Sequence, residues 1–268
     1  MASIDLHPTE LAYAFAYSKT EEVIGWGREP FLPTGRDTAS GAAWYAEGEE
    51  RLRAAERLLG NPDTGLRFSD AMTAAILALA NPGVVLLAQR KAGEGVKTLT
   101  IHAAGDTLVG LTRRSDGIFE LSRYTDLTAA AGAGAGFVGA TIAPLDREAR
   151  VEANHQVLSK LRQLAKLGQT EKVLAAIAQL GASDTDAKSA ILALTRPSVA
   201  GVLSVLYCAS NRVEDAETFS VATNAHEHSW IVFPPADLAG PMVLERSSVA
   251  ALAARVAVGV AARLGVSA

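Results

Sequence analysis

Three glycines near the middle of the chain have the spacing of a dinucleotide-binding turn. The stretch GAGAGFVGA, residues 132–140, places Gly134, Gly136 and Gly139 in the pattern Gly-x-Gly-x-x-Gly. In a dinucleotide-binding fold such glycines follow a hydrophobic strand, let the backbone approach a pyrophosphate and open a helix. Here they follow RYTDLTAA, which is no hydrophobic strand, and the segment after them is charged and helical. We therefore predict an alanine-rich helix that packs closely at its glycines, and no dinucleotide site.

Two histidines lie close enough in the sequence to share a metal ion. His226 and His228 flank Glu227 in NAHEHSW, so a strand would present both imidazoles on one side. A catalytic zinc ion needs three protein ligands and an open position, and no third ligand is indicated. We interpret the stretch as an exposed polar turn and predict no metal ligands in it. Whether His226 and His228 bind a metal ion is a question for experiment.

The other candidate groups favour packing over catalysis. His155 lies near an apolar helix stripe, where we expect it to be half-buried, and His7 precedes a proline. Cys208 is the only cysteine, so the chain cannot form an internal disulfide, and its place at a strand end favours a packing role. The sequence has no Gly-x-Ser-x-Gly elbow. We predict a protein that is not an enzyme, with no catalytic residues and no cofactor.

The composition narrows the class of partner. The chain has 268 residues, a formal net charge of -4 and no segregated basic region, so nucleic acid is not an expected partner. Its first residues, MASIDLHPTELAYAF, lack the basic start and apolar run of a signal peptide. No window approaches the roughly 20 apolar residues of a membrane-spanning helix. We expect a cytoplasmic protein that does not insert into a membrane.

An internal sequence repeat predicts two similar sets of helices and strands, which carry the candidate residues above. The stretch AILALANPGVV, residues 75–85, matches AILALTRPSVA, residues 190–200. In both, an apolar helix reaches a proline, Pro82 or Pro197, that cannot continue the helix and biases the preceding residue toward an extended conformation. Each proline therefore marks a switch from helix to strand.

Four short strands and a closing helix follow each switch. The first set of strand segments is 84–90, 96–103, 106–113 and 117–123, and the second is 199–207, 217–223, 228–234 and 241–246. Their composition and their Gly-rich or charged turns indicate antiparallel meanders. The closing helices follow Thr125 and Ser247 or Ser248, which are the expected N-caps.

Alternation in the first meander predicts a sheet with one covered face. In residues 98–103, Leu99 and Ile101 fall on one face of the strand, and Thr100 and His102 fall on the other. A sheet that packs on one side and faces water on the other has this pattern. We therefore expect His102 on a polar, solvent-facing side.

Further helices precede each meander. They are residues 40–60 and 68–80 in the first half, and residues 146–168 and 170–181 in the second. The last two helices are expected to end at Gly168 and Gly181, because glycine commonly follows a helix end. A short N-terminal helix is expected to start near Pro8.

The order of these features resembles the EspG family, the cytosolic substrate-specific chaperones of type VII secretion systems. The resemblance lies in LHPTELAYAF at the start and in the switches LALANPGVVLLA and LALTRPSVAGVL, each followed by a meander and a closing helix. It implies one α/β (α+β) domain over residues 1–268, made of two pseudo-symmetric halves, about 1–143 and 144–268. The quasi-twofold halves would share a central sheet flanked by helices.

The resemblance also implies a function without catalysis. The protein would be a cytosolic chaperone or adaptor that binds a helical secretion substrate, a PE–PPE-like heterodimer, and keeps it soluble. A helical tip that needs cover would bind an apolar groove. Two alternatives stay open: a small-molecule-binding protein or enzyme with a pocket between the two repeats, and a self-associating structural or regulatory protein. A homo-oligomer is compatible with each of them.

Four consecutive apolar residues in the second meander are the predicted partner-binding strand. They are Trp230, Ile231, Val232 and Phe233, and successive side chains of a strand point to opposite faces. Trp230 and Val232 would share one face, and Ile231 and Phe233 the other. Either both faces are covered, or one face is an exposed interaction surface. We predict that the partner binds through these four residues.

Overall fold

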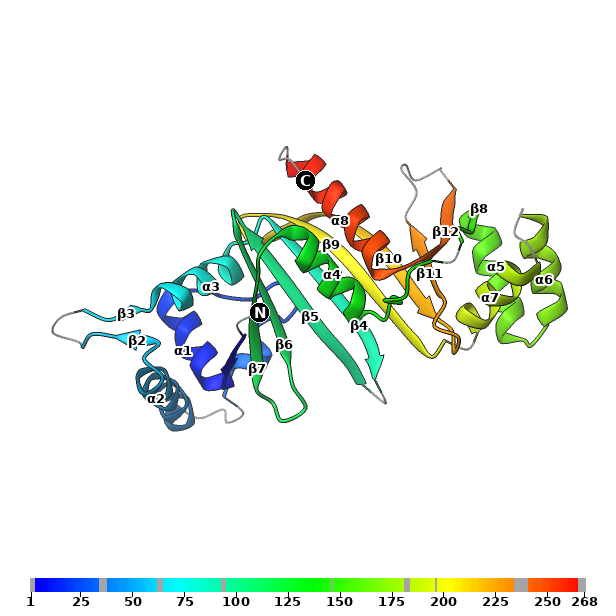
Figure 1. Ribbon diagram of the computed structural model, residues 1–268. Helices are drawn as coiled ribbons and strands as arrows, with labels where there is room; N and C mark the ends of the chain where they lie inside the picture. The colour runs from blue at the N-terminus through cyan, green and yellow to red at the C-terminus, as the bar shows by residue number, and fades with distance from the viewer. Residues whose placement is uncertain are drawn as a thin grey trace. The chain divides into compact units, whose positions relative to one another are not determined.

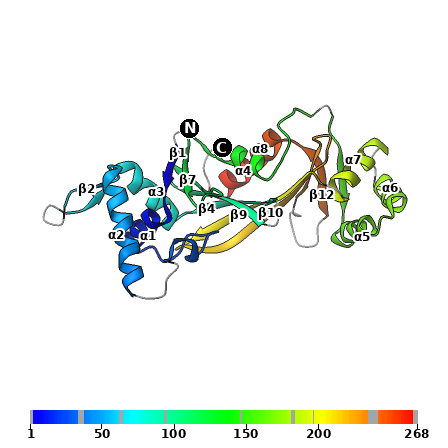
Figure 2. The same cartoon turned by 90° about the horizontal axis from the view of Figure 1, so that it is seen from below.

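The protein has a mixed α/β fold in which helices lie against antiparallel strands (Figures 1 and 2). The computed structural model describes residues 3–33, 38–61, 65–92, 95–145, 147–180, 184–195, 197–233 and 241–264. The α-helices are α1 (Pro8–Ser18), α2 (Thr38–Ala54), α3 (Asp70–Ala80), α4 (Leu127–Phe137), α5 (His155–Lys166), α6 (Thr170–Gln179), α7 (Asp184–Thr195) and α8 (Val249–Leu264), with a 3-10 helix η1 (Glu29–Phe31). In these described ranges, no helix is both long and apolar enough to cross a membrane.

The strands form one large sheet and one small one. They are β1 (Ser3–Leu6), β2 (Leu58–Leu59), β3 (Arg67–Phe68), β4 (Val84–Ala92), β5 (Gly95–Ala104), β6 (Thr107–Arg113), β7 (Phe119–Tyr124), β8 (Arg150–Ala153), β9 (Val199–Ala209), β10 (Arg212–Thr223), β11 (Ser229–Phe233) and β12 (Met242–Ser247). Hydrogen bonding orders ten of them as β1-β7-β6-β5-β4-β9-β10-β11-β12-β8 and pairs β2 with β3. The predicted α+β fold class is confirmed.

The succession of elements after each proline is the one predicted from the sequence. After Pro82 the chain forms β4, β5, β6 and β7 and then α4, and after Pro197 it forms β9, β10, β11 and β12 and then α8. Helix α3 precedes the first set and α7 precedes the second. The pairs with a described register are antiparallel, as in a meander, with Leu111 of β6 opposite Leu121 of β7.

The chain divides into two compact units that interleave along the sequence. Unit 1 comprises Met1–Val85, Leu99–Asp126 and Leu206–Asp215, and unit 2 comprises Leu86–Thr98, Leu127–Val205 and Ala216–Ala268. Each unit therefore takes segments from both of the halves, 1–143 and 144–268, that were expected from the sequence.

In unit 1, helices α1 and α3 pack with strands β1, β6 and β7 around an apolar core. Leu6, Leu11, Met72, Leu79 and Phe119 are among its largest fully buried side chains. Strand β1 was not predicted from the sequence, and it pairs antiparallel with β7. Burial of such large apolar side chains is the main stabilising contribution to a core of this kind.

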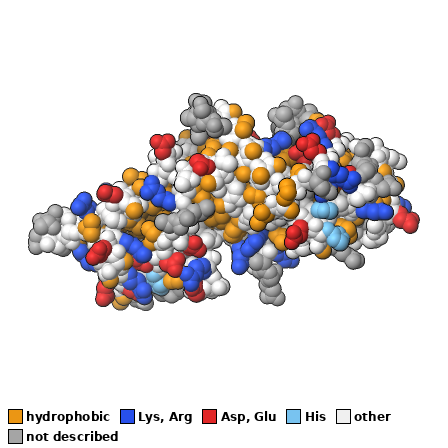
Figure 3. All heavy atoms as spheres, in the orientation of Figure 1, with side chains coloured by type: hydrophobic (Ala, Val, Ile, Leu, Met, Phe, Trp, Pro, Cys, Tyr) orange, Lys and Arg blue, Asp and Glu red, His pale blue; other side chains and the backbone are white. Residues whose placement is uncertain are grey.

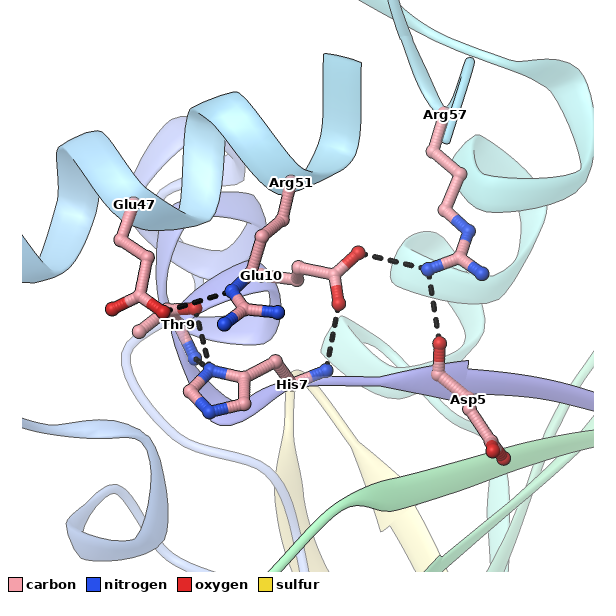
Figure 4. A network of polar contacts seen from close by, with 7 residues as sticks. All are labelled: Asp5, His7, Thr9, Glu10, Glu47, Arg51 and Arg57. Atoms are coloured by element: carbon pink, nitrogen blue, oxygen red, sulfur yellow. Dashed lines mark hydrogen bonds and ion pairs between the residues drawn. The ribbon is translucent and has the colours of Figure 1, made fainter. Parts of the chain in front are cut away.

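A polar network holds the start of α1 in place (Figure 4). His7 is the N-cap residue, and its backbone N–H donates to Oε2 of Glu10 at 2.7 Å. The other carboxylate oxygen of Glu10 lies 2.8 Å from Nη1 of Arg57, and the same nitrogen donates to the carbonyl oxygen of Asp5 at 2.9 Å. The helix begins at Pro8, as predicted.

The polar face predicted for residues 98–103 is covered. Thr100 and His102 are fully buried, because the connection after α1 places Trp26 against this face. Nε1 of Trp26 donates to Oγ1 of Thr100 at 2.8 Å, and Nε2 of His102 lies 3.0 Å from the same oxygen. Burial lowers the pKa of His102 to about 3. The prediction of a solvent-facing His102 is therefore wrong.

In unit 2, helices α5, α6 and α7 pack on strands β8, β11 and β12. Their core includes Val151, Leu161, Ile177, Ile191 and Leu244. Figure 1 shows the three helices gathered beside β8 and β12. Strand β8 pairs antiparallel with β12, and Val151 lies opposite Leu244.

The single helix predicted for residues 146–168 is wrong in its first part. Residues Arg150–Ala153 form β8 because β12, which is distant in the sequence, supplies a pairing partner. Oδ1 of Asn154 then accepts a hydrogen bond from the backbone of Val157 at 2.8 Å and caps α5. An N-cap of this kind satisfies one of the free amides of the first turn.

The helix ends follow most of the predicted signals. Gly168 follows α5 with a φ of +71°, and Oγ of Ser248 accepts from the backbone of Ala251 at the start of α8. Helix α4 begins at Leu127, so the cap position belongs to Asp126 and the prediction of Thr125 as the cap is wrong. Gly181 and the side chain of His155 lie outside the described residues.

The glycine stretch lies where α4 meets its neighbours in unit 2. A side chain at Gly136 would lie 3.9 Å from Val249 of α8, and one at Gly134 would lie 3.2 Å from Leu203 of β9. Gly139 follows the helix with a φ of +92°, which L side chains rarely adopt. The predicted close-packing helix is confirmed.

Candidate partner-binding surface

The four residues predicted to bind a partner lie in the interior of unit 2. Trp230, Ile231, Val232 and Phe233 of β11 are 1%, 0%, 5% and 2% exposed. The guanidinium of Arg255 also covers the Phe233 ring, 3.8 Å from its centroid. Of the two interpretations of this strand, the one with both faces covered is correct. The exposed-surface interpretation is wrong, because α7 and α8 supply cover from distant parts of the sequence.

A buried polar network joins β11 to α7. Oγ of Ser189 lies 3.1 Å from Nε1 of Trp230, 3.3 Å from Nδ2 of Asn224 and 3.3 Å from Nδ1 of His228. The indole and amide nitrogens can only donate, so the hydroxyl accepts from both of them. Its own proton is then directed to Nδ1 of His228, which places His228 in a structural network.

The histidine pair lies in a polar turn, as predicted. Oδ1 of Asn224 accepts from the backbone amides of His226 and His228 and shapes this turn. His226 is exposed, and the two rings are 6.5 Å apart. Among the described residues, no group of three or more His, Cys, Asp or Glu side chains is placed to hold a metal ion.

Cys208 does not have the surroundings of a reactive thiol. Its side chain is half-buried, and Sγ donates to the carbonyl oxygen of Leu206 at 3.6 Å. Burial raises the pKa of the thiol. A higher pKa disfavours the thiolate, which is the nucleophilic form.

One face of the sheet in unit 2 is open to solvent. In β9 the side chains of Leu203 and Val205 are buried, whereas Val202 is 36% exposed and Ser204 is half-buried. The adjacent strand β10 alternates in the same way: Phe219 and Val221 are buried, and Thr218, Ser220 and Ala222 are exposed or half-buried. Oγ of Ser204 lies 3.1 Å from Oγ1 of Thr218 on the open face. This alternation is typical of a sheet that is covered on one side only.

A depression of about 430 Å³ lies on this open face. Residues of β4, β5, β9, β10, α5 and α7 line it. Its apolar lining includes Val96, Ala193, Leu194, Pro197, Val202 and Ala222. Val96 is 64% exposed and Val202 is 36% exposed, so two of the larger apolar side chains of this lining face solvent.

A glycine keeps the strands below the depression close together. A Cβ atom at Gly201 would lie 2.7 Å from Cβ of Val138 and 2.8 Å from the carbonyl oxygen of Gln89. Only glycine fits without movement of the backbone at this position. Beside it, the guanidinium of Arg90 lies 5.1 Å from the centroid of the Phe137 ring, which restrains this side chain of β4.

Three cations border the depression. Arg90, Lys91 and Arg162 line it, and its described lining contains no Asp or Glu. Within the described part of the chain, none of the three forms an ion pair with a carboxylate. The surface therefore combines an apolar floor of small side chains with a positively charged border.

This surface could not be found by scanning the sequence. Its residues come from six elements, and the rest of the first meander, α4, β8 and the start of α5 lie between Lys91 and Arg162 in the sequence. One local signal was present, because Ala200, Val202, Ser220 and Ala222 occupy alternate strand positions with small or apolar side chains. The strongest apolar signal in the sequence belongs to β11, which the fold buries.

One solved structure with a similar fold is that of a type VII secretion chaperone. The structure is similar to that of the Mycobacterium tuberculosis type VII secretion system chaperone EspG5, solved in complex with the PE25–PPE41 dimer. The TM-score is 0.63 at 12% sequence identity, over 96% of this chain and 95% of that chain. No protein-family model matches the sequence, and no curated protein matches it significantly. At this level of identity the likeness shows the fold.

Proposed function

We propose that the protein is a cytoplasmic chaperone or adaptor that binds a helical, PE–PPE-like protein partner and keeps it soluble. The observation that carries this proposal is the open face of β9 and β10, with its depression of about 430 Å³ and its exposed apolar side chains. Exposed apolar surface bordered by polar groups is typical of protein-binding sites.

The shape of the surface supports a helix as the bound element. Its floor is built from small side chains, among them Ala200, Gly201, Ser220 and Ala222, so a helix can approach the sheet closely. Amphipathic helices commonly bind by laying apolar side chains into such grooves. The fold supports the PE–PPE class in particular, because the similar chaperone EspG5 was solved with a PE–PPE dimer.

The proposal is tested by co-expressing the protein with PE–PPE heterodimers, first those of its own genome and then PE25–PPE41. Affinity purification followed by size-exclusion chromatography with light scattering should yield a complex of one copy of each chain. Val202→Asp and Ala222→Asp place a charge on the proposed floor, and each should weaken binding at least tenfold, because the apolar face of the partner would then cover a carboxylate that loses its water.

Val258→Asp is the matched control. Val258 is 59% exposed on α8 of the same unit and does not line the depression. We expect this variant to bind within about twofold of the wild type, because exposed substitutions away from an interface change little. Absence of any complex would contradict the chaperone assignment, and equal losses in all three variants would contradict the proposed surface.

A further inference from the structure

We infer that a small pocket in unit 1 binds a guanidinium group, carried by an arginine side chain or by a free small cation. The pocket lies where the end of α1, the connection that follows it, η1 and α2 come together. All of its described lining residues belong to unit 1. The inference therefore does not depend on the proposed function, which concerns the open face of unit 2.

The volume of the pocket limits what it can hold. It measures about 70 Å³, which is room for about two water molecules at roughly 30 Å³ each. A guanidinium group, with one carbon and three nitrogen atoms, is of this size. An indole ring or a turn of helix is too large. The occupant is therefore a single small group at the end of a side chain or of a small molecule.

Aromatic rings form much of the wall. Phe15, Phe31 and Tyr45 line the pocket. Phe15 and Phe31 are 5% and 4% exposed, and their ring centroids are 5.0 Å apart at an interplanar angle of 80°, so packing fixes both rings. Aromatic rings attract cations within about 6 Å of the ring centroid. A guanidinium group is planar and weakly hydrated, and it stacks on such rings better than an ammonium group does.

The charged side chains of the wall favour a cation as well. Glu21, Glu22 and Arg28 line the pocket, so two carboxylates against one guanidinium leave one negative charge. All three side chains are exposed, and within the described part of the chain none of them forms an ion pair. An uncharged occupant would take water from the carboxylates and give them no partner in return.

The end of α1 adds to the negative side of the pocket. Ala12, Phe15 and Ala16 of this helix line it, and the C-terminal end of a helix carries about half of a negative charge. The last turn of α1 contains no basic residue. Lys19, which follows as the C-cap, is not among the lining residues. The helix end therefore favours a cation in the same place as the two carboxylates do.

Hydrogen bonds hold the backbone that carries the carboxylates. The amide of Thr20 donates to the carbonyl oxygen of Phe15 at 2.9 Å, and Nδ2 of Asn211 donates to the carbonyl oxygen of Glu22 at 3.3 Å. The backbone is thus fixed on both sides of Glu21. A site that is formed before the ligand arrives loses less conformational entropy on binding.

The experiment titrates the full-length protein, labelled with nitrogen-15, with two capped tripeptides and follows the amide signals by NMR at constant ionic strength. One peptide is Gly-Arg-Gly, and the other has citrulline, the uncharged analogue of arginine, at its centre. We expect the arginine peptide to bind at least tenfold more tightly, with saturable shifts in residues 12–32. Methylguanidinium is the third probe. Tighter binding of the arginine peptide identifies a protein segment as the source of the group, and tighter binding of methylguanidinium identifies a free small cation.

The decisive variant is Glu21→Gln with Glu22→Gln. It should reduce the preference for arginine over citrulline to less than about threefold, while the melting temperature stays within a few degrees because both side chains are exposed. The matched control is Glu29→Gln with Glu50→Gln, two exposed carboxylates of unit 1 outside the pocket. The control makes the same change in net charge and should keep the preference within about twofold.

Arg28→Gln tests the sign of the charge effect. Arg28 is the only cation in the described lining, and it repels a guanidinium group that enters. Its removal should therefore tighten binding of the arginine peptide at least twofold. A pocket that selected its occupant by apolar contact alone would not respond in this way.

Four results would overturn the inference. They are equal binding of the arginine and citrulline peptides, no saturable shift in residues 12–32 with any probe, an equal effect of the control variant, and weaker binding of the arginine peptide to Arg28→Gln. None of them decides the proposed function, which depends on whether a PE–PPE heterodimer co-purifies with the protein.

Discussion

Trp230 of β11 donates its indole N–H to Oγ of Ser189 in α7 across 3.1 Å. Trp230 is 1% exposed and Ser189 is 8% exposed, so water cannot replace this bond. The contact fixes α7 against β11, and the end of α7 contributes Ala193 and Leu194 to the wall of the depression. A buried hydrogen bond thus links the strand first predicted to bind a partner with the surface that we propose for binding.

Replacing Ser189 with Ala should lower the free energy of unfolding by about 1–3 kcal/mol. The change leaves the N–H groups of Trp230 and Asn224 buried without this acceptor. Ser204→Ala is the control, since its hydroxyl contacts Thr218 on the exposed face, and it should change the free energy by less than about 0.5 kcal/mol. Urea denaturation measures both, and equal effects would show that the network around Ser189 adds no stability.

His102 should make the stability of the protein depend on pH. Burial holds the pKa of His102 at about 3 in the folded chain, against 6.5 ordinarily. Below about pH 6.5 the unfolded chain binds a proton that the folded chain does not, so the free energy of unfolding falls as the pH decreases toward 3. The slope is up to about 1.4 kcal/mol per pH unit.

The test compares wild type with His102→Leu by urea denaturation at pH 7, 6 and 5. Between pH 7 and pH 5 we expect the wild type to lose about 2 kcal/mol more than the variant, which has no imidazole to protonate. His226→Leu, at an exposed position, should keep the slope of the wild type. If wild type and His102→Leu lose the same unfolding free energy between pH 7 and pH 5, a group other than His102 causes the loss of stability in acid.

The features of the fold that the sequence predicts correctly are those set by residues close together in the chain. Pro82 and Pro197 ended their helices because proline cannot continue a helix, and Gly168 marked the end of α5 because its conformation suits glycine. These signals act within a few residues, so the sequence pattern revealed them. They were sufficient for the order of helix, four strands and helix after each switch.

The rest depended on contacts between residues that are distant in the sequence. Arg150–Ala153 became β8 only because β12 pairs with it, and His102 was buried because Trp26 packs on Thr100. The binding strand was misassigned for the same reason, since apolar content alone does not show whether α7 and α8 will cover Trp230 or Phe233. The open face consists of small or polar residues such as Ser220, and such residues give no sequence signal as strong as the apolar run of β11.

The ion pair between Glu10 and Arg57 should contribute to the stability of unit 1. Their atoms are 2.8 Å apart, and the side chains are 7% and 23% exposed. Breaking a fully buried pair costs about 3–5 kcal/mol, and the partial exposure of Arg57 lowers our expectation for Glu10→Gln to about 2 kcal/mol. Glu47→Gln breaks an exposed pair with Arg51 and should cost less than about 0.5 kcal/mol. Thermal and urea unfolding check both values, and similar costs would contradict the importance of burial.

The last prediction separates backbone strain from steric clash at two glycines of unit 2. Gly168 and Gly139 both have positive φ, +71° and +92°, but a Cβ atom at Gly168 meets nothing within 4 Å, whereas one at Gly139 collides with Val199. Gly168→Ala should therefore cost about 1 kcal/mol of unfolding free energy, from backbone strain alone. Gly139→Ala should cost about 2–4 kcal/mol, because the clash adds to the strain. Combining it with Val199→Ala removes Cγ1, the closest clashing atom, and leaves only Cβ of residue 199 at 2.9 Å, so the double variant should lose at least about 1 kcal/mol less than the sum of the two single losses. Strictly additive losses in urea denaturation would mean that Val199 does not restrict the exit from α4, and that strain alone accounts for the glycine.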